Sequence, residues 1–214
     1  MKITLLCSDE EHPINAWLEQ WIQRHSGVHE ISLVRHKEEL RGGDILFLIS
    51  CAQIIGAEER ALYNADLVLH ASDLPQGRGW SPHIWRIIEG ADEITLSLLE
   101  AEDQVDSGRI WQQVCVPVVP HALWDEINAD LFAAEIELLD YAIQHFSSIE
   151  PQEQDISIEP TYYPRRTPAD SRIDPEKSIV SQFNQMRVCD PTRFPAYFDL
   201  HGHRYKITLE KIHD

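Results

Sequence analysis

A histidine and an aspartate in this chain have surroundings that suit proton transfer. His70 directly follows the apolar run 67–69 and precedes Ala-Ser-Asp-Leu-Pro at 71–75, so its imidazole is expected at the carboxyl end of a buried strand. Asp106 lies in the polar loop 101–108. A carboxylate beside an imidazole orients the ring and raises its basicity, which suits general acid–base catalysis. The two residues therefore predict a site that moves a proton.

Each of these residues also has a purely structural interpretation. A histidine at the end of a strand more often completes a core than performs catalysis, and an acidic loop that ends in Ser107-Gly108 is usually a turn. His70 and Asp106 are 36 residues apart, which leaves room for one helix and one strand between them. The two side chains are therefore expected to meet across neighbouring strand ends.

The apolar pattern predicts an α/β fold in which a mostly parallel sheet carries helices on both faces. Ligands bind such sheets at the carboxyl ends of the strands, where His70 is expected. Short apolar runs predict strands, and apolar residues at threes and fours predict helices. The predicted strands are 2–7, 31–34, 45–49, 67–69, 94–99 and 110–114, and the predicted helices are 13–24, 37–41, 57–64, 81–89 and 124–146.

The remainder of the chain differs in character. Residues 147–172 hold several prolines and polar residues without periodicity, which predicts a linker or an extended arm. A helical stretch and then a hairpin, with strands near 197–199 and 205–209, are expected after it. We therefore divide the chain into a catalytic domain, 1–146, and a polar arm with a small helix and hairpin extension, 147–214.

The charge and the cysteines of the chain indicate which kinds of partner, metal and compartment to expect. The net charge of −18, from 36 acidic and 18 basic residues, repels phosphate backbones and anionic membrane surfaces, so neither nucleic acid nor a membrane is the expected partner. Four scattered cysteines lack metal-ligand spacing and indicate reduced thiols, and no metal is expected. No apolar run approaches the length of a signal peptide or a membrane span. A cytoplasmic protein is expected.

Three motifs in a fixed order are more specific. They are His-Ala-Ser-Asp-Leu-Pro at 70–75, Gly-Arg-Gly at 77–79 followed by Ser81-Pro82, and Val-Asp-Ser-Gly at 105–108. Together they resemble the catalytic loop, Gly-rich turn, helix and aspartate loop of the formyltransferases that use 10-formyltetrahydrofolate. The resemblance implies a Rossmann-like formyltransferase fold, 10-formyltetrahydrofolate as the cofactor, and His70 and Asp106 as the catalytic residues.

The resemblance covers roughly residues 44–114, and a weaker one at 166–174 is similar to the arm that follows the catalytic core in the tRNA and sugar enzymes. It also implies binding residues. Those expected to line the folate are Gln53, Ile54, Ile55, Ala101, Glu102, Asp103 and Val105. By motif position, the cations expected to hold substrate phosphates are Arg78, Arg165 and Arg166. For Arg165 and Arg166 the alternative that they only neutralise nearby carboxylates stays open.

One departure from the family pattern concerns the chemistry. The family has an asparagine two residues before the histidine, where this chain has Val68. That asparagine donates a hydrogen bond to the formyl oxygen, and removing one such donor generally costs ~3 kcal/mol. Either protonated His70, a backbone N–H or another side chain replaces it, or the protein is a weakened or silent relative. Asn64 is a weaker candidate for the replacement.

The first loop and the charge distinguish the branches of the family. The glycinamide ribonucleotide enzymes resemble one another in a Gly-Ser-Asn loop that cradles a phosphate, whereas residues 8–13 here have no glycine and three carboxylates. The tRNA enzymes resemble one another in a basic C-terminal domain, whereas this chain is acidic. The sugar N-formyltransferases remain, and His-Ala-Ser-Asp-Leu-Pro at 70–75 with Gly-Trp-Ser-Pro at 79–82 resembles their nonulosonic (pseudaminic) acid type. They imply formyl transfer to the amine of a small, nucleotide-linked amino sugar. A homodimer, a formyltetrahydrofolate hydrolase and a catalytically silent folate-binding module stay open.

Overall fold

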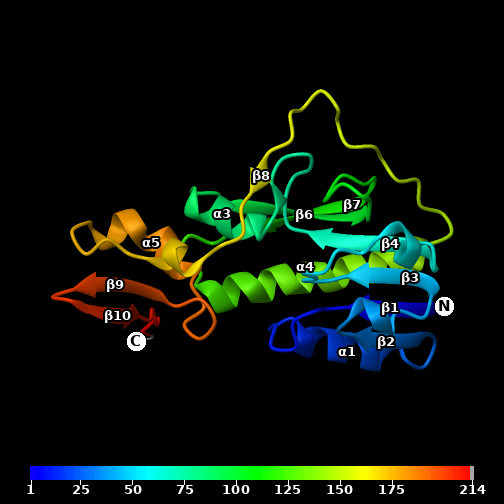
Figure 1. The fold of residues 1–214 in the computed structure, drawn as a ribbon, viewed down its shortest axis with the longest axis horizontal. Helices are drawn as coiled ribbons and strands as arrows, with labels where there is room; N and C mark the ends of the chain where they lie inside the picture. Colours follow the sequence, from blue (N-terminus) through cyan, green and yellow to red (C-terminus); the bar gives the residue numbers. More distant parts are fainter. Residues whose placement is uncertain (213–214) are drawn as a thin grey trace.

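The computed structural model describes residues 1–212 and is built on a six-stranded sheet (Figure 1). The strand order is β2-β1-β3-β4-β6-β7. Neighbouring strands run parallel from β2 to β4, whereas β6 is antiparallel to both of its neighbours. The bounds are β1 Lys2–Leu6, β2 Glu30–Val34, β3 Gly43–Leu48, β4 Tyr63–His70, β6 Glu93–Glu100 and β7 Ile110–Pro117. The α/β prediction is confirmed, with a mixed rather than an all-parallel sheet.

The helices cover the two faces of the sheet unequally. The main core joins one face of the sheet to α1, Asn15–His25, to α3, Pro82–Ile88, and to the long α4, Trp124–His145, which runs along the sheet (Figure 1). The opposite face has a smaller core, flanked by the 3-10 turn η1, Lys37–Glu39, and by α2, Ala57–Arg60. The face with short elements leaves room for loops to reach the sheet.

The helix predicted over 57–64 is shorter in the structure, and this excludes Asn64 from the site. Tyr63 begins β4 because its ring is buried and its hydroxyl donates to Thr4 Oγ1 at 3.0 Å. Asn64 is exposed in that strand and donates to Asp44 Oδ1 at 3.1 Å. His70 lies six positions after Asn64 along β4, about 20 Å away at the usual rise of a strand. The suggestion that Asn64 replaces the family asparagine is therefore wrong.

Residues 147–167 form an arm that returns over the sheet (Figure 1). Gln152 bridges Ile110 at the start of β7, and β8, Tyr162–Tyr163, pairs with the short β5, Arg78–Gly79. A Cβ on Gly79, where φ is +95°, would lie 2.5 Å from the Tyr163 carbonyl oxygen, so only glycine allows this approach. The extended arm predicted from the sequence therefore has fixed contacts.

The C-terminal extension has its own small core. It contains η2, Pro168–Ser171, α5, Ile179–Arg187, and the hairpin of β9, Ala196–Leu200, with β10, His203–Ile207. His201 and Gly202, with φ of 50° and 80°, form the two-residue turn that a hairpin favours. The predicted helix and hairpin are confirmed, and a domain boundary at residue 146 stays a prediction. None of the helices within residues 1–212 has the length and apolarity that crossing a bilayer requires.

Candidate active site

The structure brings His70 and Asp106 together. His70 Nε2 lies 3.5 Å from Asp106 Oδ2, and the two side chains are 7% and 8% exposed. The route differs from the expected meeting of strand ends, because β6 is antiparallel to β4. The loop after β6 starts beside Asp66, where the Ala101 N–H donates to the Asp66 carbonyl at 2.8 Å. It must fold back over the sheet before Asp106 reaches His70.

The contacts of His70 assign its tautomer. Nε2 lies 2.9 Å from the Gly77 carbonyl oxygen as well as near the Asp106 carboxylate. Both neighbours accept hydrogen bonds, so Nε2 carries the proton. In the neutral ring Nδ1 is therefore the nitrogen with a free lone pair. The pair presents Nδ1 as the atom that can accept a proton from a substrate.

The arm holds the aspartate loop, residues 101–108, through a residue that sequence reasoning missed. The Gln154 side chain donates to the carbonyl oxygens of Asp106 at 2.8 Å and Gly108 at 2.9 Å, and it accepts from Arg78 Nη2 at 2.6 Å. Asp106 Oδ2 in turn accepts the Gly79 N–H at 2.8 Å. Gln154 lies in a segment with no periodicity, so no pattern marked it. It positions the loop rather than taking part in the chemistry.

A hollow of about 310 Å³ lies against the same loop. Glu102 and Asp103, both predicted to line the folate, are in its wall. An Asp103 oxygen also accepts from Arg60 Nη2 at 2.7 Å. The other lining residues are Gln104, Ser107, Gly108, Arg109 and Glu153. Three carboxylates, those of Glu102, Asp103 and Glu153, belong to this wall together with Arg109, so the hollow can accept hydrogen bonds from N–H groups of a ligand.

The remaining predicted folate residues lie in different environments. Ile55 is buried in the smaller core, and Ala101 packs against that core. Gln53 is committed to the fold, because its side chain accepts the Lys37 N–H at 2.9 Å and donates to the Arg35 carbonyl at 2.8 Å. Two further residues, Ile54 and Val105, are 83% and 56% exposed. Their role in folate binding stays a prediction.

The three predicted phosphate ligands differ in exposure. Arg78 is buried beneath the arm, where it contacts Gln154 and, at 3.4 Å, the Tyr162 hydroxyl. Arg165 is exposed and stacks 4.9 Å over the Trp80 ring. Arg166 is half-buried, and its Nη2 donates to Ser171 Oγ at 3.1 Å. A phosphate-binding role for these arginines stays a prediction.

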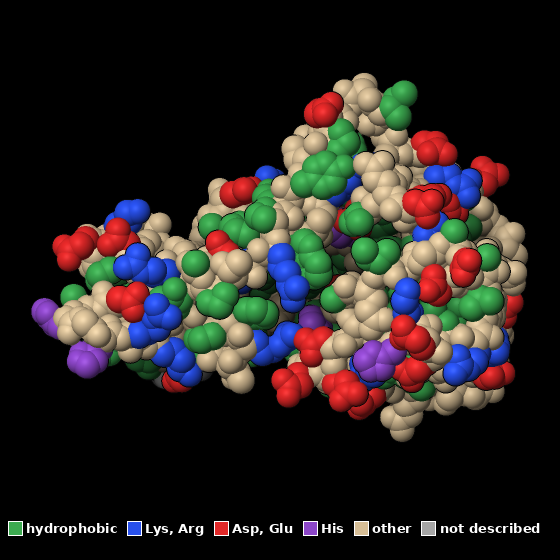
Figure 2. Space-filling model, viewed as in Figure 1, with side chains coloured by type: hydrophobic (Ala, Val, Ile, Leu, Met, Phe, Trp, Pro, Cys, Tyr) green, Lys and Arg blue, Asp and Glu red, His purple; other side chains and the backbone are tan. Residues whose placement is uncertain are grey.

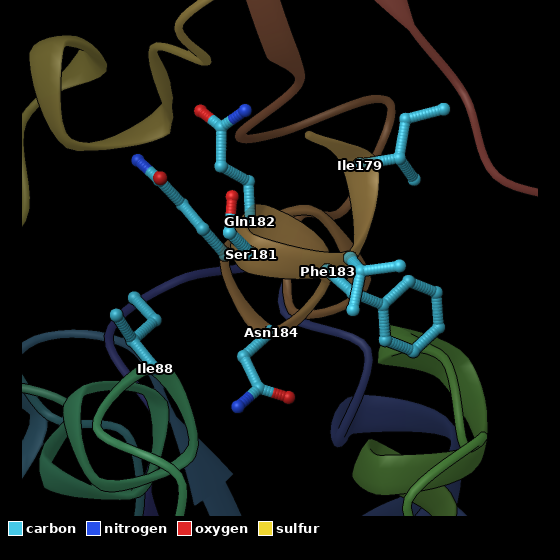
Figure 3. Close-up of a pocket in the computed structure, with 8 residues that line it drawn as sticks. Ile88, Ile179, Ser181, Gln182, Phe183 and Asn184 are labelled. Carbon is cyan, nitrogen blue, oxygen red and sulfur yellow. The ribbon is translucent and has the colours of Figure 1, made fainter. Parts of the chain in front are cut away.

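A second hollow, of about 430 Å³, lies at α5 in the C-terminal extension (Figure 3). Ile88 of α3 faces it from the other side, and none of the predicted site residues lines it. Its other lining residues are Ile179, Val180, Ser181, Gln182, Phe183, Asn184 and Gln185. The larger hollow is therefore separate from the residues that suit proton transfer.

Residues 40–143 match the model of a known family, described as formyl transferase. This segment contains His70 and the loop that carries Asp106. This segment belongs to the formyl transferase family. The chain spans about half the length of the curated relatives it matches. They include methionyl-tRNA formyltransferases from Streptococcus gordonii, 27% identical over 81% of this chain and 56% of that protein, and from Pseudothermotoga lettingae, 31% identical over 68% of this chain and 49% of that protein.

Solved structures share the fold of the whole chain. A methionyl-tRNA formyltransferase from Clostridium thermocellum has a TM-score of 0.84 at 19% identity and covers 100% of this chain and 94% of that one. A 4-N formyltransferase from Francisella tularensis has a TM-score of 0.71 at 19% identity, with 99% and 98% covered. HypX from Aquifex aeolicus, in complex with tetrahydrofolic acid, has a TM-score of 0.79 at 20% identity, with 95% and 36% covered. At these identities the likeness is one of fold.

Within the formyl transferase segment, Val68 has an apolar role. It lies on the face of β4 that carries the smaller core and packs against that core with Cys51 and Ala101. A valine there adds apolar contact but has no hydrogen-bond donor. Any donor for a substrate oxygen beside Val68 must therefore come from another group.

Gly108 fixes the end of the aspartate loop, and we expect Gly108→Ala to destabilise the formyl transferase segment by about 2 kcal/mol or more. A Cβ at this position would lie 1.9 Å from the Glu100 carbonyl oxygen, so the backbone must move. Chemical unfolding measures the loss. The matched control is Gly27→Ala, where no atom within the described chain lies within 4 Å of the new Cβ. Equal stability of the two variants would contradict this close packing.

Proposed function

We propose that this chain is a folate-dependent formyltransferase that formylates the amine of a small, nucleotide-linked amino sugar. The observation that carries the proposal is the buried pair of His70 and Asp106, 3.5 Å apart, within the segment that matches the formyl transferase family. The arm residue Gln154 supports the proposal further, because it holds the loop of Asp106 from a distant part of the chain.

The residues of the pair divide the work. An amine that attacks a formyl carbon forms the new C–N bond and must lose a proton, and His70 Nδ1 has the free lone pair to accept it. The bond between the formyl carbon and N10 of the folate would then break, and the proton on His70 can pass to N10 as tetrahydrofolate leaves. The imidazolium that forms keeps its Nε2–H on the Gly77 carbonyl, and it is stabilised by the Asp106 carboxylate beside it. Asp106 stays fixed because the Gly79 N–H donates to it. Burial of both side chains strengthens these interactions.

The hollow beside Glu102 and Asp103 fits the donor. 10-Formyltetrahydrofolate would supply the formyl group, and its pterin ring carries an exocyclic amine and a ring N–H. The carboxylates and carbonyl oxygens of the hollow can accept hydrogen bonds from these groups. Asp106 and the hollow share one loop, because the residues that line the hollow flank Asp106. A pterin bound in this hollow would lie against the loop that carries Asp106, and this supports the proposal.

The acceptor is proposed from the charge of the protein. Acidic side chains are spread over the face drawn in Figure 2, and the net charge is −18, which opposes the backbone of a tRNA. A small nucleotide-linked sugar needs only a few cations near its phosphates. The candidates are Arg78 on β5 and, on the arm, Arg165 and Arg166. The second candidate acceptor is methionyl-tRNA, which the names of the curated relatives favour. All four cysteines are free thiols, which supports a cytoplasmic location.

A transfer assay tests the proposal. The protein is incubated with 10-formyltetrahydrofolate and either a panel of nucleotide-linked amino sugars or methionylated initiator tRNA, and products are identified by mass spectrometry. We expect an N-formyl sugar and no formylated tRNA. Formylated tRNA would contradict the sugar acceptor. Release of formate without an amine would indicate a hydrolase, and folate binding without any turnover would indicate a silent module.

A further inference from the structure

Several buried polar atoms of the described residues have no hydrogen-bond partner, and most of them lie in the segments that follow His70 in the chain or on the arm. Within residues 1–212 five buried side-chain atoms lack a partner, and four of them belong to the loop after His70, to β5, to α3 and to the arm. A buried unpartnered group costs about 1–3 kcal/mol, so these atoms need an explanation. The four atoms are Ser72 Oγ, Arg78 Nε, His83 Nδ1 and Arg166 Nε.

His83 is the titratable member of this set that has no role in the mechanism so far. It lies in the first turn of α3, shortly after Ser81, whose φ of 45° is unusual for a residue with a side chain. Burial lowers the pKa of His83 to about 3, and the positive charges of His70, His12 and Arg166 lower it further. The ring is therefore neutral near pH 7, so that Nδ1 can donate in one tautomer.

His12 offers a comparison within the same region. Burial, followed by the charge of Arg193, lowers the pKa of His12 to about 4, so this ring is also neutral. Its nitrogens have partners, however. Nδ1 accepts the Ile14 N–H at 3.3 Å, and Nε2 lies 3.3 Å from Ser50 Oγ. His12 thus belongs to the hydrogen bonding of the fold, whereas Nδ1 of His83 has no such partner within the described chain.

The arginine whose charge acts on His83 is free to bind an anion. Nη2 of Arg166 contacts Ser171 Oγ at 3.1 Å and Cys189 Sγ at 3.9 Å, and no carboxylate of residues 1–212 forms a salt bridge with it. The Thr167 N–H and, to a smaller extent, the charge of Arg166 lower the pKa of Asp170, so a carboxyl group lies near Arg166 without forming an ion pair with it. Arg166 Nε has no hydrogen-bond partner within residues 1–212. Near the middle of the face in Figure 2, basic side chains in blue and histidine atoms in purple lie close to hydrophobic ones.

We propose that His83 is a substrate-binding residue whose Nδ1–H, together with the Arg166 guanidinium, holds an anionic oxygen of the acceptor substrate. The inference rests on the proposed formyl transfer and specifies the acceptor as a molecule with an anionic group, a phosphate or a carboxylate. A neutral N–H donor beside a cation favours an anion. Binding would also satisfy the buried atoms that are unpartnered in the free protein.

Steady-state kinetics of His83→Leu test this role. We expect the KM for the acceptor to rise about tenfold or more, as for the loss of a hydrogen bond to a charged group, while the KM for the folate donor changes less than about twofold. The melting temperature should stay the same or rise, because leucine removes an unpartnered polar atom. His83→Asn, whose amide N–H can take the place of Nδ1–H, should retain most of the affinity.

Two outcomes overturn the inference. A fall in melting temperature with both KM values raised would make His83 a structural residue, and an unchanged KM for the acceptor would remove it from the binding site. Direct binding separates this inference from the proposed reaction. Calorimetry with inorganic pyrophosphate and with acetate should show weaker binding of one anion to His83→Leu than to the wild type, even if no acceptor is formylated. Equal binding of both anions to the two proteins would contradict the inference.

Discussion

Replacing His70 by alanine is expected to lower formyl transfer by about a hundredfold or more and to leave the protein folded, since a positioned acid–base group usually contributes roughly 10²–10⁴. The imidazole is the group that presents a free lone pair beside Asp106, so alanine leaves water alone to accept the proton of the amine. The rate is measured with saturating formyl donor and amine, and circular dichroism checks the fold.

Two further variants make this result specific. Asp106→Ala should also lose about a hundredfold, because it removes both the charge beside His70 and the acceptor of the Gly79 N–H. His203→Ala, an exposed histidine of the hairpin, should retain full activity and serves as the control. Near-wild-type turnover in His70→Ala or in Asp106→Ala would show that the residue concerned is not catalytic.

The second large effect is expected from Glu135, a carboxyl buried in α4. Burial raises the pKa of Glu135 from 4.5 to about 8, and Oε2 has no partner within residues 1–212. Between pH 4.5 and 8 the unfolded state loses this proton while the folded state keeps it, so the free energy of unfolding falls as the pH rises. Over that range the loss amounts to at most about 5 kcal/mol.

Glu135→Gln should remove this pH dependence. Urea unfolding of wild type and variant is measured at about pH 5, 7 and 9. We expect the free energy of unfolding of the variant to increase relative to that of the wild type at each higher pH. A packing difference caused by the amide adds the same amount at every pH and does not affect this trend. Glu137→Gln changes an exposed carboxyl of the same helix and should give no such trend. A stability difference that is independent of pH in Glu135→Gln would mean that this carboxyl is ionised in the folded state.

The main features of the fold follow from apolar periodicity alone. The strands that enter the core and the helix 124–146 have continuous or threes-and-fours patterns, and the structure has them within a few residues. The direction of a strand relative to its neighbour cannot be predicted in this way. The apolar pattern of β6 would be the same whether β6 ran parallel or antiparallel to β4. The antiparallel pairing is set by the connection through β5 and α3, which no single segment encodes.

In the candidate site, too, residues in local motifs could be predicted, whereas residues that depend on distant contacts could not. His70 and Asp106 stand in short motifs, so the sequence marks them. Gln154 and His83 do not, because what distinguishes each is a neighbour far along the chain: Arg78 and the aspartate loop for Gln154, and Arg166 for His83. The contact of His70 with the Gly77 carbonyl, which assigns the tautomer, likewise depends on the course of the backbone.

The return of the arm over the sheet sets the smallest piece of the chain that keeps an intact site. A fragment that stopped after α4 would retain His70 and Asp106, yet it would lose the Gln154 amide and the backbone partner that β8 offers to β5. The aspartate loop would then be held at one end only. We therefore expect a working fragment to extend at least through Tyr163, because a boundary at residue 143, where the family match ends, separates His70 and Asp106 from the segment that holds the aspartate loop.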